Sequence, residues 1–380
     1  MKLLAVVGTR PEAIKMAPVM LEARRRGSDV EVCATAQHRG MLDQVLRVFG
    51  ITPERDLDLM RHDQTLADLS ARALVGLDAV LAESRPDWVL VQGDTTTAMI
   101  AALAAFYRRI PVGHVEAGLR THDLDRPFPE ELNRVIADAV SRARFVPTEG
   151  ARENLLREGI AGDTIYVTGN TVVDALQSVL ANDDRTAPIP GVPALQAGER
   201  LVLVTAHRRE SFGEGMQSIA RAIARIAALH SDVRVVYPVH PNPSVRAVMG
   251  QVLEGFERVH LIEPLDYLPF VRTMSRAHVI LSDSGGVQEE APSLGVPALV
   301  LRETTERPEA VAAGAVRLVG VDEEAIVASA DLLLRDPGEH ARMARAMNPY
   351  GDGRASERIL AILRGEPWEP YRPAGIAPSE

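Results

Sequence analysis

Short runs of apolar and β-branched residues alternate with longer segments of helical period along most of the chain. Continuous apolar runs separated by helices are typical of parallel strands that are buried on both faces. We expect a first series of strands at residues 3–7, 30–35, 88–92, 112–115, 144–147 and 165–168. We expect a second series at residues 201–205, 233–239, 259–262, 279–281, 298–301 and 316–319. The pattern predicts an α/β protein with two doubly wound parallel-sheet domains.

The two series of strands also predict the domain boundaries. A proline-rich stretch without helical period, residues 183–198, is expected to be a linker. It separates an N-terminal domain, residues 1–182, from a C-terminal domain, residues 199–355, and residues 356–380 form a last helix and tail. Ligands of open α/β sheets bind at the carboxyl ends of the strands, so two such domains facing each other predict a binding cleft.

Composition narrows the class of protein. The 380 residues carry 42 Lys and Arg against 52 Asp and Glu, a net charge of −10, and only 15 residues are aromatic. With no basic stretch, we expect no nucleic-acid partner. A single cysteine, Cys33, excludes a disulfide within the chain and suits a reducing cytosol. We find no signal peptide, and the longest apolar run, residues 98–107, is shorter than the about 20 residues of a membrane span. We therefore expect a cytoplasmic protein that does not bind membranes.

The loop after the first expected strand is a candidate anion site. Pro11 in this loop suits the first turn of a helix. Arg10 would then lie at a helix N-terminus, where free N–H groups and the helix dipole favour a phosphate. Lys15, one of only two lysines in the chain, follows in the same helix. The alternative, that Arg10 and Lys15 lie on a solvated helix face, stays open.

The loop after the fourth strand of the second series is another candidate anion site. Gly285 and Gly286 allow backbone N–H groups to approach a phosphate closely, and Ser284 adds a hydroxyl donor. Glu290, one turn into the expected helix, can accept hydrogen bonds from a ribose diol. A plain tight turn is the alternative. Together with Arg10 in the other domain, this loop suggests a diphosphate held across the cleft.

Three carboxylates follow strands of the first series: Asp94, Glu116 and Glu130. Carboxylates that lie close together shift one another's pKa values, so acid and base forms can coexist in one pocket. Arg134 is placed to pair with Glu130 on one helix face or to bind an anion. For each carboxylate alone, a helix N-cap or a surface salt bridge is the alternative interpretation.

Two histidines, His207 and His240, follow strands of the second series. With arginines beside His207, they favour anion recognition or general acid catalysis over a purely structural role. No close-spaced set of His, Cys and Asp is present, so we expect no metal site. The residues alone predict a two-domain protein that binds a nucleotide or a sugar phosphate.

Seven sequence blocks stand in a fixed order: GTRPE at 8–12, QHR at 37–39, GDTTT at 93–97, HVEAG at 114–118, PEELNR at 129–134, HRRE at 207–210 and SGG at 284–286. In these blocks and their spacing the chain resembles the non-hydrolysing UDP-N-acetylglucosamine 2-epimerases, from residue 3 to about residue 360. The resemblance implies a homodimer with the glycosyltransferase-B architecture, two Rossmann-like domains around a cleft. It also implies that the C-terminal helix packs back on the N-terminal domain.

The resemblance implies three sets of site residues. Catalytic or leaving-group roles fall on Asp94, Glu116, Glu130 and His207. Contacts with UDP fall on Arg10, Lys15, Arg134, His240, Ser284, Gly285, Gly286 and Glu290. A regulatory site, at which UDP-N-acetylglucosamine activates bacterial members, falls on Gln37, His38, Gln64, Arg208 and Glu210. Gly40 and Asp63 depart from the longer polar or basic residues of some regulated members.

The family interconverts UDP-N-acetylglucosamine and UDP-N-acetylmannosamine without a metal or a nicotinamide cofactor, through elimination of UDP to a glycal and its re-addition. The resemblance therefore implies this reaction, in the supply of a surface polysaccharide. Four alternatives stay open: a hydrolysing 2-epimerase, a 2-epimerase of a modified UDP-sugar, a glycosyltransferase of the same architecture, and a UDP-sugar sensor without catalysis.

Overall fold

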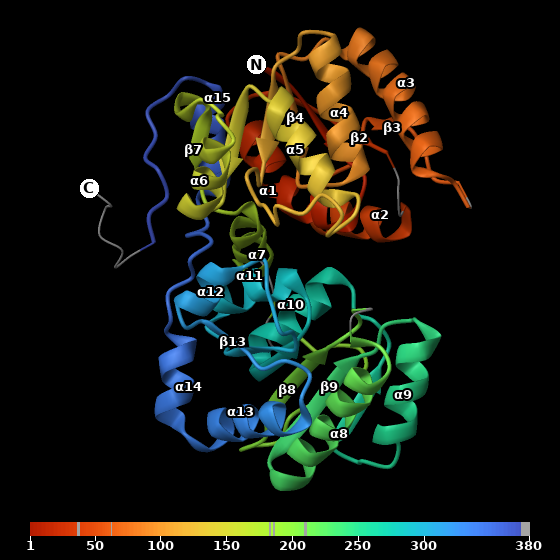
Figure 1. Cartoon of the computed structure of the whole chain (residues 1–380), viewed down its shortest axis with the longest axis vertical. Helices are drawn as coiled ribbons and strands as arrows, with labels where there is room; N and C mark the ends of the chain where they lie inside the picture. Colours follow the sequence, from red (N-terminus) through yellow and green to blue (C-terminus); the bar gives the residue numbers. More distant parts are fainter. Residues whose placement is uncertain (36–38, 62, 182–183, 185–186, 209–210, 374–380) are drawn as a thin grey trace. The chain divides into compact units, whose positions relative to one another are not determined.

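Two units of the chain each form their own parallel sheet (Figure 1). We describe them from a computed structural model, which covers residues 1–35, 39–61, 63–181, 184, 187–208 and 211–373. The N-terminal unit comprises Met1–Val179 and Tyr350–Glu380, and the C-terminal unit comprises Leu180–Pro349. The boundaries expected from the sequence, with a linker at 183–198, stay a prediction.

The N-terminal sheet has seven strands in the order β3-β2-β1-β4-β5-β6-β7, and every pair is parallel. The strands are β1 (Lys2–Val7), β2 (Asp29–Ala34), β3 (Arg55–Asp56), β4 (Trp88–Gln92), β5 (Val112–Val115), β6 (Ala143–Val146) and β7 (Ile165–Val167). All six predicted strands are present, and β3 was missed because its two residues are charged and form no apolar run. The strand order reverses between β1 and β4, where a doubly wound sheet binds its ligands.

Helices cover both faces of this sheet. They are α1 (Arg10–Arg25), α2 (Arg39–Val48), α3 (Leu66–Ser84), α4 (Thr96–Tyr107), α5 (Glu130–Val140), α6 (Glu149–Arg157), α7 (Thr171–Ala181) and α15 (Ala355–Leu363), with a 3-10 turn at Gly162–Thr164. Leu4 and Val6 of β1 pack into one core with α3 and α4, and the alternating Leu3 and Ala5 are also fully buried. On the opposite face α1 packs against α2 and α15, so both faces are excluded from water.

The C-terminal sheet has six parallel strands in the order β10-β9-β8-β11-β12-β13. The strands are β8 (Arg200–Thr205), β9 (Val233–Pro238), β10 (Val259–Ile262), β11 (Ala277–Ser282), β12 (Ala298–Val300) and β13 (Val316–Leu318). The helices are α8 (Glu214–Leu229), α9 (Pro243–Leu253), α10 (Tyr267–Arg276), α11 (Gly285–Leu294), α12 (Pro308–Ala312), α13 (Glu323–Arg335) and α14 (Pro337–Ala344). The predicted fold class, two doubly wound parallel-sheet domains, is confirmed.

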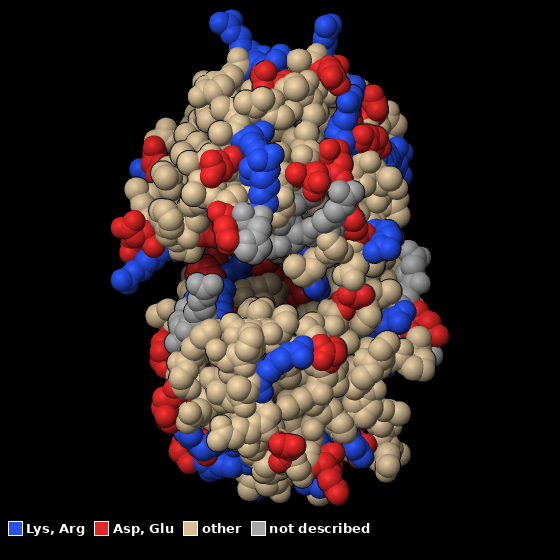
Figure 2. All heavy atoms as spheres, turned by 90° about the vertical axis from the view of Figure 1, so that its right-hand side faces the viewer, with Lys and Arg blue, Asp and Glu red and all other residues tan. Residues whose placement is uncertain are grey.

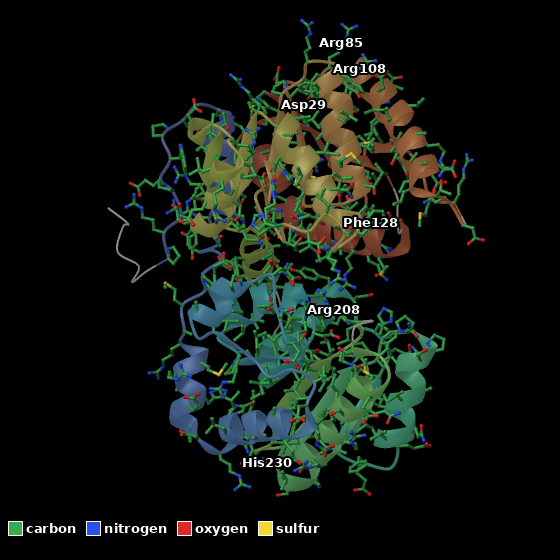
Figure 3. The ribbon with its side chains drawn as sticks, in the orientation of Figure 1. Asp29, Arg85, Arg108, Phe128, Arg208 and His230 are labelled. Carbon is green, nitrogen blue, oxygen red and sulfur yellow. The ribbon has the colours of Figure 1, made fainter. Side chains whose placement is uncertain are left out.

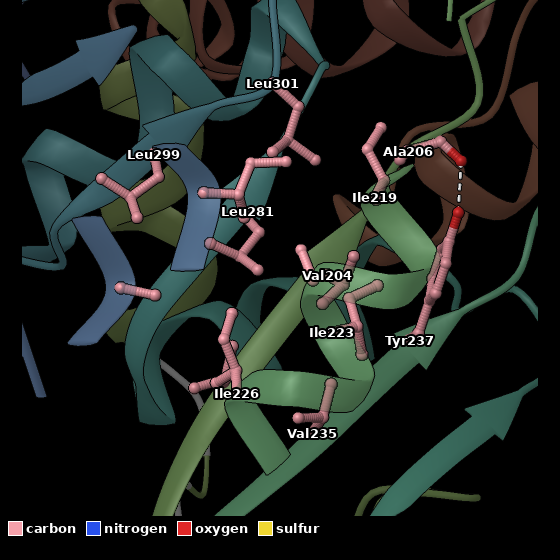
Figure 4. Packing of buried hydrophobic residues seen from close by; sticks show 14 of the residues in the cluster. Val204, Ala206, Ile219, Ile223, Ile226, Val235, Tyr237, Leu281, Leu299 and Leu301 are labelled. Atoms are coloured by element: carbon pink, nitrogen blue, oxygen red, sulfur yellow. Dashed lines mark hydrogen bonds between the residues drawn. The ribbon is translucent and has the colours of Figure 1, made fainter. Parts of the chain in front are cut away.

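A buried tyrosine marks the core of the C-terminal unit (Figure 4). Tyr237 on β9 is fully buried among apolar side chains that include Ile219 and Ile223 of α8. Its hydroxyl donates a 2.5 Å hydrogen bond to the carbonyl oxygen of Ala206, just after β8. Because a buried hydroxyl needs a partner, this bond ties the core to the segment that follows β8.

The two edges of the N-terminal sheet can be told apart in Figure 3. Asp29 begins β2, and Arg85 and Arg108 directly follow α3 and α4, so these residues lie at the amino edge of the strands. Phe128 precedes α5 and lies at the opposite, carboxyl edge.

On the face seen in Figure 2, Lys and Arg are interspersed with Asp and Glu over both units. Of the described helices, none combines the length and the apolar character that crossing a membrane requires.

Asp174 of α7 fastens α15 to the N-terminal unit. Its carboxylate accepts hydrogen bonds from the backbone N–H of Ala355 at 3.2 Å and of Ser356 at 2.7 Å, and from the Ser356 hydroxyl at 2.5 Å. Burial raises the pKa of the Asp174 carboxyl to about 6, although these hydrogen bonds oppose the rise. The carboxylate therefore caps a helix that begins 181 residues later in the chain, and its burial costs desolvation free energy.

Replacing Asp174 with Asn should remove a pH dependence of stability. A pKa raised above the unfolded value means that the carboxyl stabilises the fold below about pH 4 and loses this contribution as the pH rises through about 6. Between pH 4 and pH 7, the free energy of unfolding of wild type should fall relative to Asp174→Asn by about 2.4 kcal/mol. Parallel urea titrations measure the difference, and a difference that stays constant over this range would contradict the prediction.

Candidate active site

The N-terminal unit brings its predicted site residues together at the carboxyl edge of three neighbouring strands. Arg10 and Lys15 follow β1, Asp94 follows β4, and Glu116 follows β5. Since β1, β4 and β5 are adjacent in the sheet, the loops after them converge. Glu130 begins α5, at the end of the loop that leaves β5.

Glu116 is a buried carboxylate held by side chains from other elements. Its Oε1 atom lies 2.5 Å from the Nζ atom of Lys15 on α1, and its Oε2 atom accepts a hydrogen bond from Gln92 on β4. Glu116 is 8% exposed and Lys15 is 9% exposed. The alternative that Lys15 lies on a solvated helix face is therefore wrong. Glu116 also has a positive φ of 63°, a conformation that non-glycine residues rarely adopt.

A further donor to Glu116 comes from Asn170, which the sequence analysis did not single out. The Asn170 amide nitrogen donates to Oε1 of Glu116 at 3.2 Å. Asn170 follows β7, so its position after a strand was a signal that could have identified it. Gln92, the last residue of β4, was missed in the same way.

Glu12 organises the loops after β1 and β4. Its carboxylate accepts hydrogen bonds from the backbone N–H of Gly8 and Thr9, and Thr9 caps α1 in return. Glu12 also accepts a 2.7 Å hydrogen bond from the hydroxyl of Thr95, just after β4. Burial raises the pKa of the Glu12 carboxyl, with the hydrogen bond from Thr95 opposing the rise. Arg10 is thereby presented from a helix N-terminus of fixed geometry.

Arg134 on α5 pairs with carboxylates other than the predicted Glu130. Its guanidinium lies 2.5 Å from Oδ2 of Asp94 and 3.3 Å from Oε2 of Glu131. Glu131 is the buried member of the Glu130–Glu131 pair and also accepts from two backbone N–H groups in the loop after β5. The N-cap of α4 is Thr95, so Asp94 is not the cap that the alternative interpretation assumed.

Asp138 forms a buried network with His114 and Arg120 that supports the loops after β4 and β5. His114 of β5 is hydrogen-bonded through Nδ1 to Asp138 at 2.7 Å and through Nε2 to the carbonyl oxygen of Gly93 at 2.8 Å. Asp138 also pairs with Arg120 at 2.8 Å and accepts from the N–H of Gly118. Burial opposes ionisation of Asp138, but His114 and Arg120 outweigh it and lower the pKa of this carboxyl. The turn that carries Asp94 is thus fixed to β5.

The C-terminal unit places three predicted segments at the carboxyl edge of its own sheet. His207 follows β8, His240 follows β9, and the Ser284–Gly286 loop follows β11, on three adjacent strands. Asp283, which the sequence analysis did not single out, is fully buried and accepts from the backbone N–H of His207 at 2.7 Å and of Arg208 at 2.8 Å. One carboxylate therefore holds the loop after β8 against the loop after β11.

The two predicted histidines lie face to face. The rings of His207 and His240 are stacked, with centroids 5.2 Å apart and planes at 8°. Nδ1 of His240 accepts a hydrogen bond from the backbone N–H of Asn242 at 3.2 Å, so a neutral ring carries its proton on Nε2. Burial lowers the pKa of His240, and the neighbouring His207 lowers it further. His207 keeps 41% of its side chain exposed and is accessible to a ligand.

The N-terminus of α11 has the features expected of a phosphate-binding loop. Ser284 is its N-cap, but its side chain makes no capping hydrogen bond. A Cβ atom on Gly286 would have only the Ser284 hydroxyl oxygen nearby, at 3.9 Å, whereas one on Gly285 would lie 2.6 Å from Nη1 of Arg307. Glu290, one turn later, is buried at 8% exposure. The loop is packed on the side of Gly285 and has space on the side of Gly286.

The predicted regulatory residues are described only in part. Gln64 lies just before α3, and its side-chain oxygen accepts a hydrogen bond from Arg72. Arg208, in the C-terminal unit, lies 3.6 Å from Glu306. Gln37, His38 and Glu210 lie outside the described residues. In the part of the chain that the structure describes, no cluster of three or more His, Cys, Asp or Glu is arranged to hold a metal ion.

Comparison with known proteins places the chain among its relatives. The sequence profile of the UDP-N-acetylglucosamine 2-epimerase family matches residues 21–364. The chain belongs to this family. It is similar to the UDP-N-acetylglucosamine 2-epimerase of Escherichia coli K12, with 53% identity over 370 residues that cover 96% of this chain and 98% of that protein. The Bacillus subtilis enzyme of the same name is 52% identical over 96% of this chain and 95% of its own length.

A solved structure supports the assignment. The UDP-GlcNAc 2-epimerase of Neisseria meningitidis, crystallised with UDP-GlcNAc bound, superposes with a TM-score of 0.89 at 49% identity, covering 96% of this chain and 100% of that one. The predicted family, fold class and enzyme class are confirmed by these matches.

The Lys15–Glu116 pair should account for a large part of the stability of the site. Replacing either partner leaves the other charge buried, so Lys15→Met and Glu116→Gln should each lower the free energy of unfolding by about 3–5 kcal/mol. The double variant should lose about 1–3 kcal/mol less than the sum, because neither charge remains. Urea unfolding measures this double-mutant cycle.

The matched control for the cycle is Lys2→Met. Lys2 is the other lysine of the chain, and its 3.4 Å contact with Glu31 is partly exposed. An exposed ion pair contributes little, so this variant should stay within about 1 kcal/mol of wild type. Strictly additive effects of Lys15→Met and Glu116→Gln would show that the two charges do not stabilise each other.

Proposed function

We propose that the chain interconverts UDP-N-acetylglucosamine and UDP-N-acetylmannosamine by inverting C2 of the sugar. The observation that carries this proposal is the buried Glu116 carboxylate, held by the Lys15 ammonium at 2.5 Å beside Asp94 at the carboxyl edge of the N-terminal sheet. Membership in the 2-epimerase family supports the choice of substrate. The relative from Neisseria meningitidis binds UDP-GlcNAc.

The chemistry requires the C1–O bond to break before C2 loses its proton. The C2 proton is not adjacent to a carbonyl group, so direct deprotonation is very costly. When the C1–O bond breaks, its electron pair leaves with UDP, and the positive charge that develops at C1 acidifies C2. A carboxylate takes the proton, and a glycal forms. A proton then adds to the opposite face of C2, and a UDP oxygen re-forms the bond to C1.

Three cations are assigned to the departing diphosphate. Arg10 lies in the first turn of α1, and His207 is exposed beside the α11 loop. An ammonium has three N–H donors, so Lys15 can hold Glu116 with one of them and a phosphate oxygen with another. Positive charge at these positions stabilises the leaving group in the transition state.

Inversion needs acid and base groups on both faces of C2, and three carboxylates are assigned to them. Glu116 is held in its ionised form by a cation and two amide donors, which suits a proton acceptor. Asp94 pairs with Arg134, and Glu130 begins the same helix as Arg134.

The UDP moiety is assigned to residues of both units. Arg134 in the N-terminal unit, and His240, the Ser284–Gly286 loop and Glu290 in the C-terminal unit, contact it in this proposal. Backbone N–H groups at the start of α11 suit a phosphate, and the Glu290 carboxylate suits the ribose hydroxyls. The space beside Gly286 supports this assignment.

Four finer assignments rest on the family resemblance and are part of the proposal. The regulatory residues Gln37, His38, Gln64, Arg208 and Glu210 bind a second UDP-N-acetylglucosamine that activates the enzyme. The protein is a homodimer. It acts in the cytoplasm, and its product supplies the synthesis of a surface polysaccharide.

Exchange of the C2 proton with solvent tests the reaction. Purified protein, given UDP-N-acetylglucosamine in deuterated water, should form UDP-N-acetylmannosamine that carries deuterium at C2, detected by NMR and mass spectrometry. Glu116→Gln should lower the exchange rate by at least about 100-fold, because an amide cannot accept the proton. Binding of UDP by this variant should change by less than about 10-fold, since Glu116 does not contact UDP in the proposal.

The other outcomes of this experiment identify the alternatives. Binding of UDP-N-acetylglucosamine without exchange of its C2 proton would contradict the epimerase proposal and favour a UDP-sugar sensor. Release of free N-acetylmannosamine and UDP would favour a hydrolysing enzyme. Turnover that requires an added acceptor would favour a glycosyltransferase, and turnover only with another UDP-sugar would favour a modified substrate.

Gly286→Ala should separate UDP binding from folding. The added methyl group meets only an ordinary contact at 3.9 Å, and alanine favours a helix, so stability should rise by up to about 1 kcal/mol. The methyl group occupies the space assigned to the phosphate, so affinity for UDP should fall at least about 10-fold, a loss of about 1.4 kcal/mol. Calorimetry measures the affinity.

Two glycine variants serve as controls for Gly286→Ala. Gly250→Ala, on α9, places its methyl group where no atom lies within 4 Å and should leave UDP binding unchanged. Gly285→Ala pushes against Arg307, which is held by Glu289 and Glu306, and should cost about 1–3 kcal/mol of stability. Wild-type UDP affinity in Gly286→Ala would remove this loop from the proposed site.

A further inference from the structure

Asn170 lies between β7 and α7 and uses both ends of its side-chain amide. It is 2% exposed. The Oδ1 atom accepts a hydrogen bond from the backbone N–H of Val172 at 3.0 Å, which fixes the orientation of the amide. The amide nitrogen therefore faces Oε1 of Glu116, 3.2 Å away. Oε1 of Glu116 is therefore bound by a charged donor from Lys15, which precedes it in the chain, and by a neutral donor from Asn170, which follows it.

The backbone of Asn170 is bound to a second segment of the chain. Its N–H donates a 2.6 Å hydrogen bond to the carbonyl oxygen of Tyr350. The chain leaves the N-terminal unit near the end of α7 and re-enters it at Tyr350. We call residues 350–356 the return segment. Asn170 therefore binds Glu116 through its side chain and the first residue of the return segment, Tyr350, through its backbone.

The return segment packs closely along the first turn of α7. A Cβ atom on Gly351 would lie 3.1 Å from Cγ2 of Val173 and 3.3 Å from the carbonyl oxygen of Asn170. At the other end of the segment, Asp174 binds the backbone N–H groups of Ala355 and Ser356. The first turn of α7 is therefore fastened to the return segment at two places, four residues apart.

We propose that Asn170 is a positioning residue, which orients the Glu116 carboxylate for proton transfer and couples it to the return segment. This inference rests on the proposed function, because it assumes that Glu116 takes part in proton transfer. Lys15 supplies charge from one direction, and Asn170 adds a directional N–H donor from another. Gln92 donates to Oε2, so Asn170 and Lys15 at Oε1 complete the fixing of both oxygens, an orientation that a flexible ammonium at Oε1 alone does not impose.

The alternative is that Asn170 serves only the turn that begins α7. The hydrogen bond from the Val172 N–H to Oδ1 closes a side-chain turn that Asp and Ser can form as well. Asn170→Asp and Asn170→Ser therefore discriminate between the two roles, because both keep an acceptor for Val172. Asp places an anion against Glu116, whereas Ser is too short to reach it. A role in the turn alone predicts nearly wild-type activity for both variants.

The positioning role predicts a graded loss of turnover. Asn170→Ser loses a hydrogen bond to a charged group, so its kcat should fall about 10- to 100-fold. The kcat of Asn170→Asp should fall further, because the new carboxylate repels that of Glu116. KM should change less than about threefold, because Asn170 is not assigned to UDP. The kinetic isotope effect with C2-deuterated substrate should increase in both variants, because proton transfer becomes more fully rate-limiting.

The control is Asn154→Ala, in the same unit. Asn154 donates to the carbonyl oxygen of Gly118 at 3.0 Å and does not contact Glu116. Its loss should leave the isotope effect at the wild-type value. An unchanged isotope effect in Asn170→Ser and Asn170→Asp, or higher turnover in Asn170→Asp than in Asn170→Ser, would overturn the positioning role.

Gly351→Ala tests the coupling to the return segment without altering Asn170. The added methyl group has contacts at 3.1–3.3 Å, so it pushes the return segment away from Asn170. A several-fold fall in kcat with a raised isotope effect is expected, and wild-type kinetics in this variant would overturn the coupling. An inactive wild-type protein would instead refute the proposed function, so the two failures are distinguishable.

Discussion

The buried carboxylate of Glu116 is the constraint on which the N-terminal site depends. A charge removed from water is tolerated only where donors replace its hydration. Here they come from Lys15 on α1, Gln92 at the end of β4 and Asn170 after β7. These residues follow or end β1, β4 and β7, and Glu116 follows β5, so the carboxylate is satisfied only when these strands have come together. The site is therefore a product of long-range folding within this unit.

Both units use a buried carboxylate to bind backbone N–H groups of a loop, as Glu12 does in the N-terminal unit. The N-terminal unit adds charges held by other side chains, as in the pairing of Arg134 with Asp94 at 2.5 Å. In the C-terminal unit, one buried carboxylate, Asp283, binds backbone N–H groups and shapes the loop that presents His207. Proton transfer requires carboxylates of defined position, whereas phosphate binding requires backbone groups and space for the ligand. The division fits a reaction in which the sugar and the nucleotide make different demands.

The strands were predictable because burial on both faces makes each of them a continuous apolar run. The strand-end positions of Asp94, Glu116 and His207 followed from the strands, since polar residues directly after an apolar run lie at the sheet edge. Asn170 and Asp283 also follow strands, so their position was predictable in the same way. Their partners were not, because their hydrogen bonds join segments more than 50 residues apart, which neither periodicity nor residue type reveals. Strand β3 has two charged residues, and its pairing with β2 is likewise visible only in three dimensions.

The burial of Lys15 gives a physical meaning to an imbalance in composition. The chain has 40 arginines and only two lysines, so most of its cationic positions accept a guanidinium. Lys2, the other lysine, keeps a third of its side chain exposed. Lys15 is buried, and its ammonium lies 2.5 Å from Glu116. A guanidinium is planar and bulkier, and it would spread its donors in one plane across the space where Gln92 and Asn170 reach the same carboxylate. An ammonium is compact and directs its donors in three directions, so it can serve a carboxylate and a phosphate from one position.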